Sequence, residues 1–147
     1  TPDTEVTGES NGAGNAFSQV LFNPTGDART ITYTLQARNV ANVPACNGAP
    51  VTLQVGVYPV PKVTGLASSI NVCEGETRAI NLSSSATGTT FAWTVDNNAN
   101  PDLPPIPAGA GAAINQTFEN NGTSLGSYQY VITPTVVIPS NGNSCVG

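Results

Sequence analysis

The sequence predicts an all-β chain of tandem β-sandwich repeats, and three observations lead to this prediction. Short apolar runs alternate with polar residues and are broken by Pro and Gly; in one run Phe91, Trp93 and Val95 fall on the same face. No apolar period of 3.6 residues persists long enough for a helix. Residues 12–21 return as 109–118 with five of ten positions identical, and this offset of 97 residues (109 − 12) fits a β domain of about 100 residues.

The repeat sets the expected domain boundaries. Cys46 corresponds to Cys145 once the intervening loop has gained two residues. We therefore expect residues 1–61 to be the C-terminal part of one repeat, with three strands and a stiff Pro-x-Pro linker. Residues 62–147 are expected to form the next repeat without its last strand, so that both chain ends would interrupt a longer polypeptide.

Each strand is expected where apolar residues alternate between turn formers. In the first repeat the strands are placed at 17–21, 31–35 and 51–57. Phe17, Gln19 and Leu21 then share one side of the first of these strands. In the second repeat the strands are placed at 70–73, 78–82, 91–95, 113–118 and 127–133. The segment 101–107 holds too many prolines for a central strand and is expected to cross an edge.

The core of the second repeat is expected to rest on aromatic residues. Trp93 on one strand and a Tyr-x-Tyr sequence on another resemble the core of an immunoglobulin domain, but the cysteines that usually join its two sheets are absent. Apolar packing must replace them, at about 1.5–3 kcal/mol for each large buried side chain. The side chains expected in this core are Phe91, Trp93, Phe118, Tyr128 and Tyr130.

Composition excludes several classes of protein. Charged residues make up 9% of the chain and hydrophobic residues 39%, which is typical of a folded β domain with a Thr, Ser and Asn surface rather than of a disordered segment. The net charge is −5 with only four basic residues, so nucleic-acid binding is not expected. No apolar stretch is long enough to span a membrane.

Enzymatic chemistry is not expected. The chain has no histidine, which removes a Ser-His-Asp or Cys-His arrangement. Carboxylate pairs can serve a glycosidase, but Glu74 and Glu76 stand beside turns, where acidic residues are usually solvated.

One acidic loop could hold calcium. Asp96, Asn98, Asn100 and Asp102 place oxygen side chains at alternate positions, and hard cations take carboxylate and amide oxygens. The loop lacks the spacing and the closing Glu of an EF-hand. Turn chemistry without a metal is the favoured interpretation, and no other cofactor is expected.

All three cysteines are disulfide candidates in an oxidising compartment: Cys46, Cys73 and Cys145, each in a Cys-x-Gly sequence. Equal numbers in each repeat suggest a Cys73–Cys145 bridge. In an immunoglobulin topology, however, these two loops lie at opposite ends of the sandwich, too far apart for a bond. A bridge between successive repeats remains the alternative, and we lean towards it.

The order and spacing of several motifs carry a family resemblance over nearly the whole chain. The motifs are Val72–Gly75, Thr90–Thr94, Tyr130–Pro134, Cys145–Gly147 and Cys46–Pro61. Together they resemble the PKD-like and immunoglobulin-like repeats of large surface proteins in the Bacteroidetes, including the giant gliding-motility adhesin of flavobacteria. The resemblance implies tandem immunoglobulin-like (PKD-like) sandwiches, an extracellular, cell-surface location, export by the type IX route and a role in adhesion.

The function expected is that of a structural or adhesive repeat module in an extended stalk or adhesin filament. The alternatives are a module that recognises carbohydrate or protein through its loops, and an accessory domain of a secreted hydrolase. Tyr58 could stack on a sugar, although packing at the repeat junction is favoured. The expected partners are neighbouring repeats of the chain or strand-donating copies, with surface polysaccharide or protein as further candidates.

Overall fold

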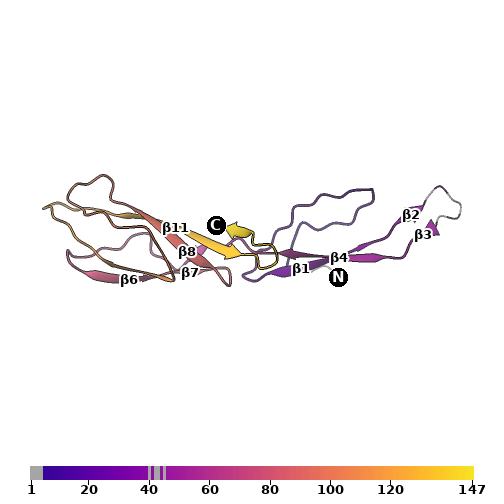
Figure 1. The fold of residues 1–147 in the computed structure, drawn as a ribbon, viewed down its shortest axis with the longest axis horizontal. Helices are drawn as coiled ribbons and strands as arrows, with labels where there is room; N and C mark the ends of the chain where they lie inside the picture. Colours follow the sequence, from indigo (N-terminus) through magenta and orange to yellow (C-terminus); the bar gives the residue numbers. More distant parts are fainter. Residues whose placement is uncertain (1–4, 40, 42–43, 45) are drawn as a thin grey trace. The chain divides into compact units, whose positions relative to one another are not determined.

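The computed structural model describes residues 5–39, 41, 44 and 46–147, and all the regular structure in them is β-strand (Figure 1). The chain divides into two compact units, Thr1–Pro59 (unit 1) and Val60–Gly147 (unit 2). The strands of unit 1 are β1 Arg29–Leu35, β2 Arg38–Asn39, β3 Cys46–Asn47 and β4 Val51–Val57. Those of unit 2 are β5 Val63–Thr64, β6 Thr77–Asn81, β7 Ser83–Ser84, β8 Thr90–Asp96, β9 Gly109–Ala110, β10 Ala113–Thr117, β11 Gln129–Val137 and β12 Ser144–Val146.

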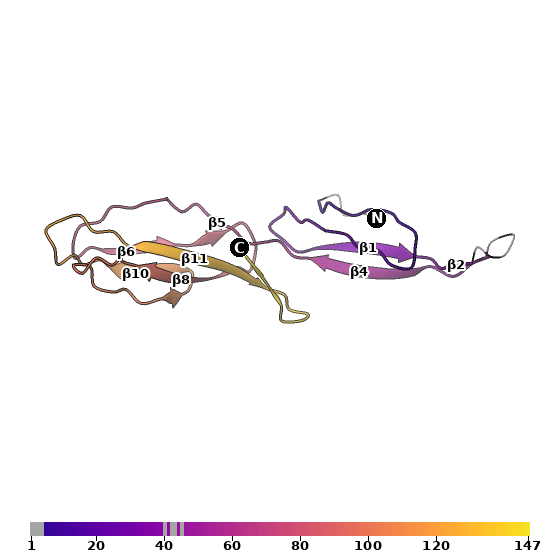
Figure 2. The same cartoon turned by 90° about the horizontal axis from the view of Figure 1, so that it is seen from above.

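Unit 2 is an immunoglobulin-like β-sandwich. One sheet has the order β12-β11-β8-β9, and β10 pairs with β6 in a second, two-stranded sheet. Figure 2 shows β8 and β11 running side by side, and their antiparallel register joins Trp93 to Ile132. The core between the sheets centres on Leu82, Phe91 and Ile114.

Aromatic side chains surround this centre. Phe91 and Phe118 are buried, whereas Trp93, Tyr128 and Tyr130 are half-buried. The rings of Phe118 and Tyr128 lie 5.9 Å apart between centroids in a tilted arrangement. The alternation of the sequence accounts for this pattern, because inward and outward positions succeed one another along β8.

β11 continues through Pro134 and ends at Val137, four residues beyond the expected strand end. Pro134 accepts a hydrogen bond through its carbonyl oxygen from the N–H of Gly147, on the edge that faces β12. In an antiparallel strand the nitrogen and the carbonyl of one residue point to the same edge. The missing N–H of Pro134 therefore costs no bond to β8, and the strand does not break there.

Two expected strands are absent. Residues 70–73 form no strand; Ile70 is 46% exposed, and the N–H of Cys73 donates to the Glu76 carboxylate, which bends the segment into a turn. Residues 17–21 of unit 1 are also outside any strand, and Phe17 is 53% exposed. The equivalent β10 is a strand because it pairs with β6, and no equivalent of β6 lies among the described residues of unit 1.

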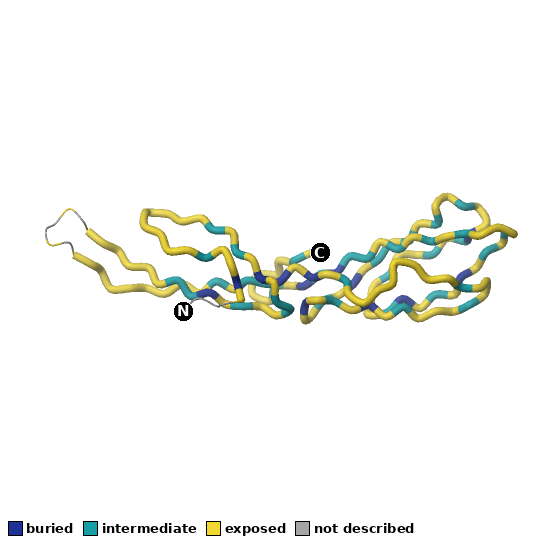
Figure 3. Tube along the Cα trace, turned by 180° about the vertical axis from the view of Figure 1, so that it is seen from behind, coloured by how far each residue is buried: buried dark blue, intermediate teal, exposed yellow. Residues whose placement is uncertain are grey.

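Unit 1 is built on a two-stranded ribbon with two unlike faces. β1 and β4 pair directly, so opposite residues share a face. One face carries Ile31, Tyr33, Leu35, Val51, Leu53, Val55 and Val57 beside Arg29; the other carries only Thr, Gln and Gly. Ile31 is buried, but the apolar face is open at its other end, where Val51 is 64% exposed. Exposed residues make up much of the trace of unit 1 (Figure 3).

Across the described residues, the structure contains no helix that is long and apolar enough to cross a membrane.

Candidate functional site

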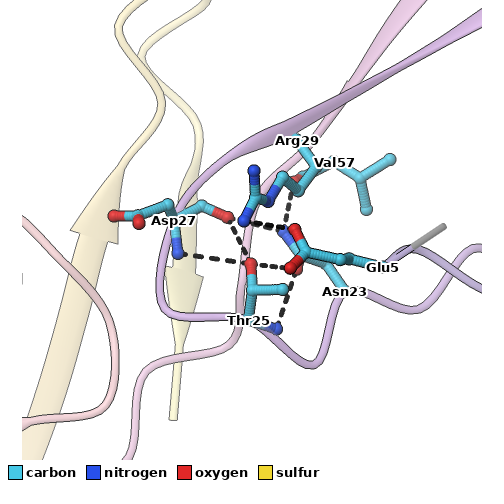
Figure 4. A network of polar contacts seen from close by, with 6 residues as sticks. All are labelled: Glu5, Asn23, Thr25, Asp27, Arg29 and Val57. Carbon is cyan, nitrogen blue, oxygen red and sulfur yellow. Dashed lines mark hydrogen bonds and ion pairs between the residues drawn. The ribbon is translucent and has the colours of Figure 1, made fainter. Parts of the chain in front are cut away.

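The two units build the same polar turn at positions 97 residues apart. In unit 1, the side-chain amide of Asn23 donates to the carbonyl oxygen of Asp27 at 2.9 Å, and Asn23 Oδ1 accepts the N–H of Thr25 at 3.0 Å (Figure 4). In unit 2, Asn120 donates to the carbonyl of Ser124 at 2.8 Å and accepts the N–H of Gly122 at 3.0 Å. The spacing of the bonded residues is identical in the two turns, so the repeat is present in the structure as well as in the sequence.

The backbone of the two units also repeats before and after these turns. Gly14 and Gly111 both have the positive φ that favours glycine, 143° and 144°. The N–H of Gly48 donates to the carbonyl of Ala37 in unit 1, and the equivalent Gly147 donates to Pro134 in unit 2. These bonds hold β3 and β12 beside the strands that precede them, since β12 is the equivalent of β3.

The units differ in how the strand edge next to these bonds is covered. β4 covers the edge of β1 along its whole length, from Arg29 opposite Val57 to Leu35 opposite Val51. The amide of Asn23 also reaches the carbonyl of Val57 at 2.7 Å, which ties the turn to the end of β4 (Figure 4). A salt bridge between Glu5 and Arg29 lies next to this bond (Figure 4).

Unit 2 has no equivalent of β4 in the described part of the chain. Asn120 accordingly keeps one hydrogen bond from its amide, to Ser124, and is half-buried where Asn23 is buried.

A pair of equivalent tyrosines, Tyr33 and Tyr130, also differs between the units. The hydroxyl of Tyr33 donates to Gln19 Oε1 at 2.6 Å, and its ring packs against Phe17 at 5.3 Å between centroids. The hydroxyl of the equivalent Tyr130 is buried and has no hydrogen-bond partner, because Gln116 turns its amide to the carbonyl of Thr117 instead. Burial raises the pKa of Tyr130 above its ordinary value, and the neighbouring Tyr128 adds to the effect.

A model of the PKD-like domain family matches residues 1–61 and 70–147. The chain belongs to the PKD-like domain family. No curated protein and no solved structure matches it. PKD-like domains are typically extracellular and are generally non-catalytic.

The acidic loop of the second PKD-like unit is organised by its own hydrogen bonds. Asp96 Oδ1 accepts the N–H of Asn98 at 2.7 Å, and Asn100 Oδ1 accepts the N–H of Asp102 at 3.0 Å. Asn98 and Ala99 both have φ of 54°, a left-handed conformation that Asn tolerates in turns. Two of the four expected oxygen ligands thus cap the turn, and calcium binding there stays a prediction.

The three cysteines are free thiols: Cys46 and Cys73 are exposed and Cys145 is half-buried. Cys73 lies at the end of unit 2 that holds Tyr128, whereas Cys145 pairs with Val136 near the other end of β11. Tyr128 stands just before β11 and eight positions before Val136, and eight extended positions span more than about 20 Å. A disulfide needs Cα atoms within about 7 Å, so unit 2 cannot close a bridge between its own two cysteines.

A shallow pocket lies at the end of unit 2 that holds Cys73. Its walls include Glu74, Leu103 and the fully exposed Leu125, and the hydroxyl of Tyr128 donates to the carbonyl of Pro104 at 2.8 Å. Glu76 makes a salt bridge with Arg78 and caps the turn at Cys73. Within the described ranges no three His, Cys, Asp or Glu side chains gather to hold a metal ion. Besides apolar groups, the pocket is lined by the thiol of Cys73, the carboxylates of Glu74 and Glu119 and the hydroxyls of Thr123 and Ser124.

Proposed function

We propose that this chain is a structural or adhesive module of a large secreted cell-surface protein, where successive PKD-like units form an extended stalk or adhesin filament. The observation that carries the proposal is the repetition itself. The Asn23 and Asn120 turns and the Gly14 and Gly111 backbones recur with one period, and the family model matches both parts of the chain, as expected for units that serve length and display.

The surface chemistry agrees with this role. The chain has few charges and no histidine, and its polar strand faces are rich in Thr and Gln, as on the outer face of the β1–β4 ribbon. A surface with so few basic residues has little attraction for nucleic acid. The finer part of the proposal is that the parent protein is a Bacteroidetes surface protein of the gliding-adhesin type, exported by the type IX route.

The experiment that tests this proposal uses the producing cells. Antibodies against the chain should label intact, non-permeabilised cells, and deletion of these residues from the gene should reduce attachment of the cells to a surface. Unchanged attachment together with reduced degradation of a secreted polymer would instead favour an accessory domain of a hydrolase. Labelling only after permeabilisation would contradict a surface location.

A recognition module is the second candidate, and the pocket beside Leu125 is the observation that favours it. The exposed side chain of Leu125 adds apolar surface at this pocket that a ligand would cover on binding. Substitution Leu125→Ser should weaken attachment if this end of unit 2 binds a ligand. The same substitution should leave attachment unchanged if the unit only provides length.

A further inference from the structure

The second sheet of unit 2 has a free edge along β10. β10 pairs with β6 from Ala113 to Thr117, and these two strands form the whole of that sheet. Among residues 5–39, 41, 44 and 46–147, no strand pairs with the other side of β10. One side of the β10 backbone therefore has no ladder.

The backbone groups on the free edge follow from the ladder to β6. The N–H of Phe118 donates to the carbonyl of Glu76 at 3.0 Å, and the carbonyl of Ala112 accepts the N–H of Leu82 at 2.9 Å. The even-numbered residues of this segment thus face β6. Successive residues of a strand point their N–H and C=O groups to opposite edges. The groups that face the free edge are those of Ala113, Asn115 and Thr117.

These groups have no backbone partner in the described part of the chain. The carbonyl of Thr117 accepts a side chain instead, the amide of Gln116 at 2.7 Å. Asn115 and Thr117 are both exposed. An exposed row of unpaired N–H and C=O groups is a template for the addition of another strand.

The sequence of β10 does not protect this edge. Natural sheets block their edges with charged side chains or with proline. The run 109–118 contains neither, whereas β6 carries Arg78. A strand that adds to the free edge therefore meets no charge, and an uncharged extended strand without proline fits it best. β10 itself is such a strand.

We propose that the free edge of β10 binds β10 of a second copy of the chain, antiparallel, with Asn115 on the twofold axis. In this register Asn115 lies opposite Asn115 of the second copy, and Ala113 lies opposite Thr117. All of these residues turn their N–H and C=O to the edge, so each opposed pair exchanges two hydrogen bonds. The same patch serves both copies, as a twofold interface requires.

The side chains are compatible with this pairing. Ile114 and Phe118 are buried, so Asn115 points to the outer face of the sheet, where it is exposed. Opposite residues of an antiparallel pair share a face, and two neutral amides then meet at the axis. The result is one continuous sheet across the two copies. The inference does not rest on the stalk function, because it concerns only the edge of β10.

The association is expected to be weak. A pair of five-residue strands buries far less than the roughly 1,200 Å² of a stable interface. The net charge of −5 on each copy opposes the contact, so added salt should strengthen the dimer by screening.

The test measures the mass of the full chain by sedimentation equilibrium over a concentration series. The unsubstituted chain should form dimers below about 1 mM. Asn115→Lys and Asn115→Glu each place like charges directly opposite one another, so each should weaken the dimer by about fivefold or more. An equimolar mixture of the two variants should restore the dimer, because opposite charges then meet at the axis.

Asn115→Ser is the matched control. It changes the same exposed side chain without adding charge, so the dimer should remain, and Trp93 fluorescence should show that unit 2 is folded in every variant. Any one of four results would overturn the proposal: a monomer at every concentration, a dimer that neither charge weakens, no recovery in the mixture, or loss of the dimer with serine.

Discussion

Removal of the tyrosine hydroxyl group should destabilise unit 1 but not unit 2. Tyr33→Phe deletes the donor of a 2.6 Å hydrogen bond and leaves Gln19 Oε1 without that partner. A bond of this kind contributes about 1 kcal/mol net. In a unit of this size that loss lowers the melting temperature by roughly 4–8 °C. Tyr130→Phe removes a buried hydroxyl that has no partner, so it should be neutral or stabilising.

The two units can be followed separately. Trp93 is the only tryptophan of the chain and lies in unit 2, so its fluorescence reports denaturant unfolding of that unit. Amide exchange of β1 reports unit 1. If Tyr130→Phe costs as much as Tyr33→Phe, the hydroxyl of Tyr130 has a partner in solution and the difference argued between the units is wrong.

The same tyrosine predicts a pH dependence. Burial raises the folded-state pKa of Tyr130, so the unfolded chain releases this proton first as the pH rises. The stability contributed by the neutral phenol is complete below the unfolded pKa near 10 and is lost as the pH rises through the folded value. Tyr130→Phe should reduce this alkaline loss, as measured by tryptophan fluorescence at increasing pH.

Three further outcomes are expected. Gly109→Ala should destabilise unit 2 by about 1–3 kcal/mol, because its new Cβ would lie 2.6 Å from the indole ring; the equivalent Gly12→Ala meets nothing within 4 Å and is the matched control in thermal melts. Chelator and added calcium should leave the melting temperature unchanged, since the Asp96–Asp102 loop is held by its own turns; a calcium-dependent rise would restore the metal site. Peptide mapping after oxidation should find no Cys73–Cys145 link within one chain, and such a link would contradict the topology of unit 2.

The alternation of apolar and polar residues predicted correctly those strands that pair with a neighbouring strand. It failed for segments that have no such neighbour. Phe91, Trp93 and Val95 alternate with the smaller Ala92 and Thr94, and β8 forms there between two neighbouring strands. The segment 70–73 has a similar composition, but local hydrogen bonding by Glu76 competes with the ladder and produces a turn. Sequence alone shows the period of side chains; it does not show which backbone groups find a partner.

The polar turns at Asn23 and Asn120 could be found in the sequence only through the repeat. The sequence around Asn23 and Asn120 does not distinguish a buried asparagine from an ordinary turn residue. The two differ in that the side-chain amide of Asn23 also donates a hydrogen bond to the carbonyl of Val57. In the acidic loop that sequence analysis chose for its chemistry, Asp96 and Asn100 accept hydrogen bonds from backbone N–H groups two residues further on, and calcium binding there stays a prediction.

Unit 1 shows how far strand formation depends on partners. The segment at 12–21 shares five of ten residues with 109–118, yet only the second copy forms a strand, and that strand pairs with β6. The local preference of the two segments is nearly the same, so the ladder to β6 supplies the difference. Within the described residues, this segment of the repeat therefore forms a strand only where a neighbouring strand pairs with it.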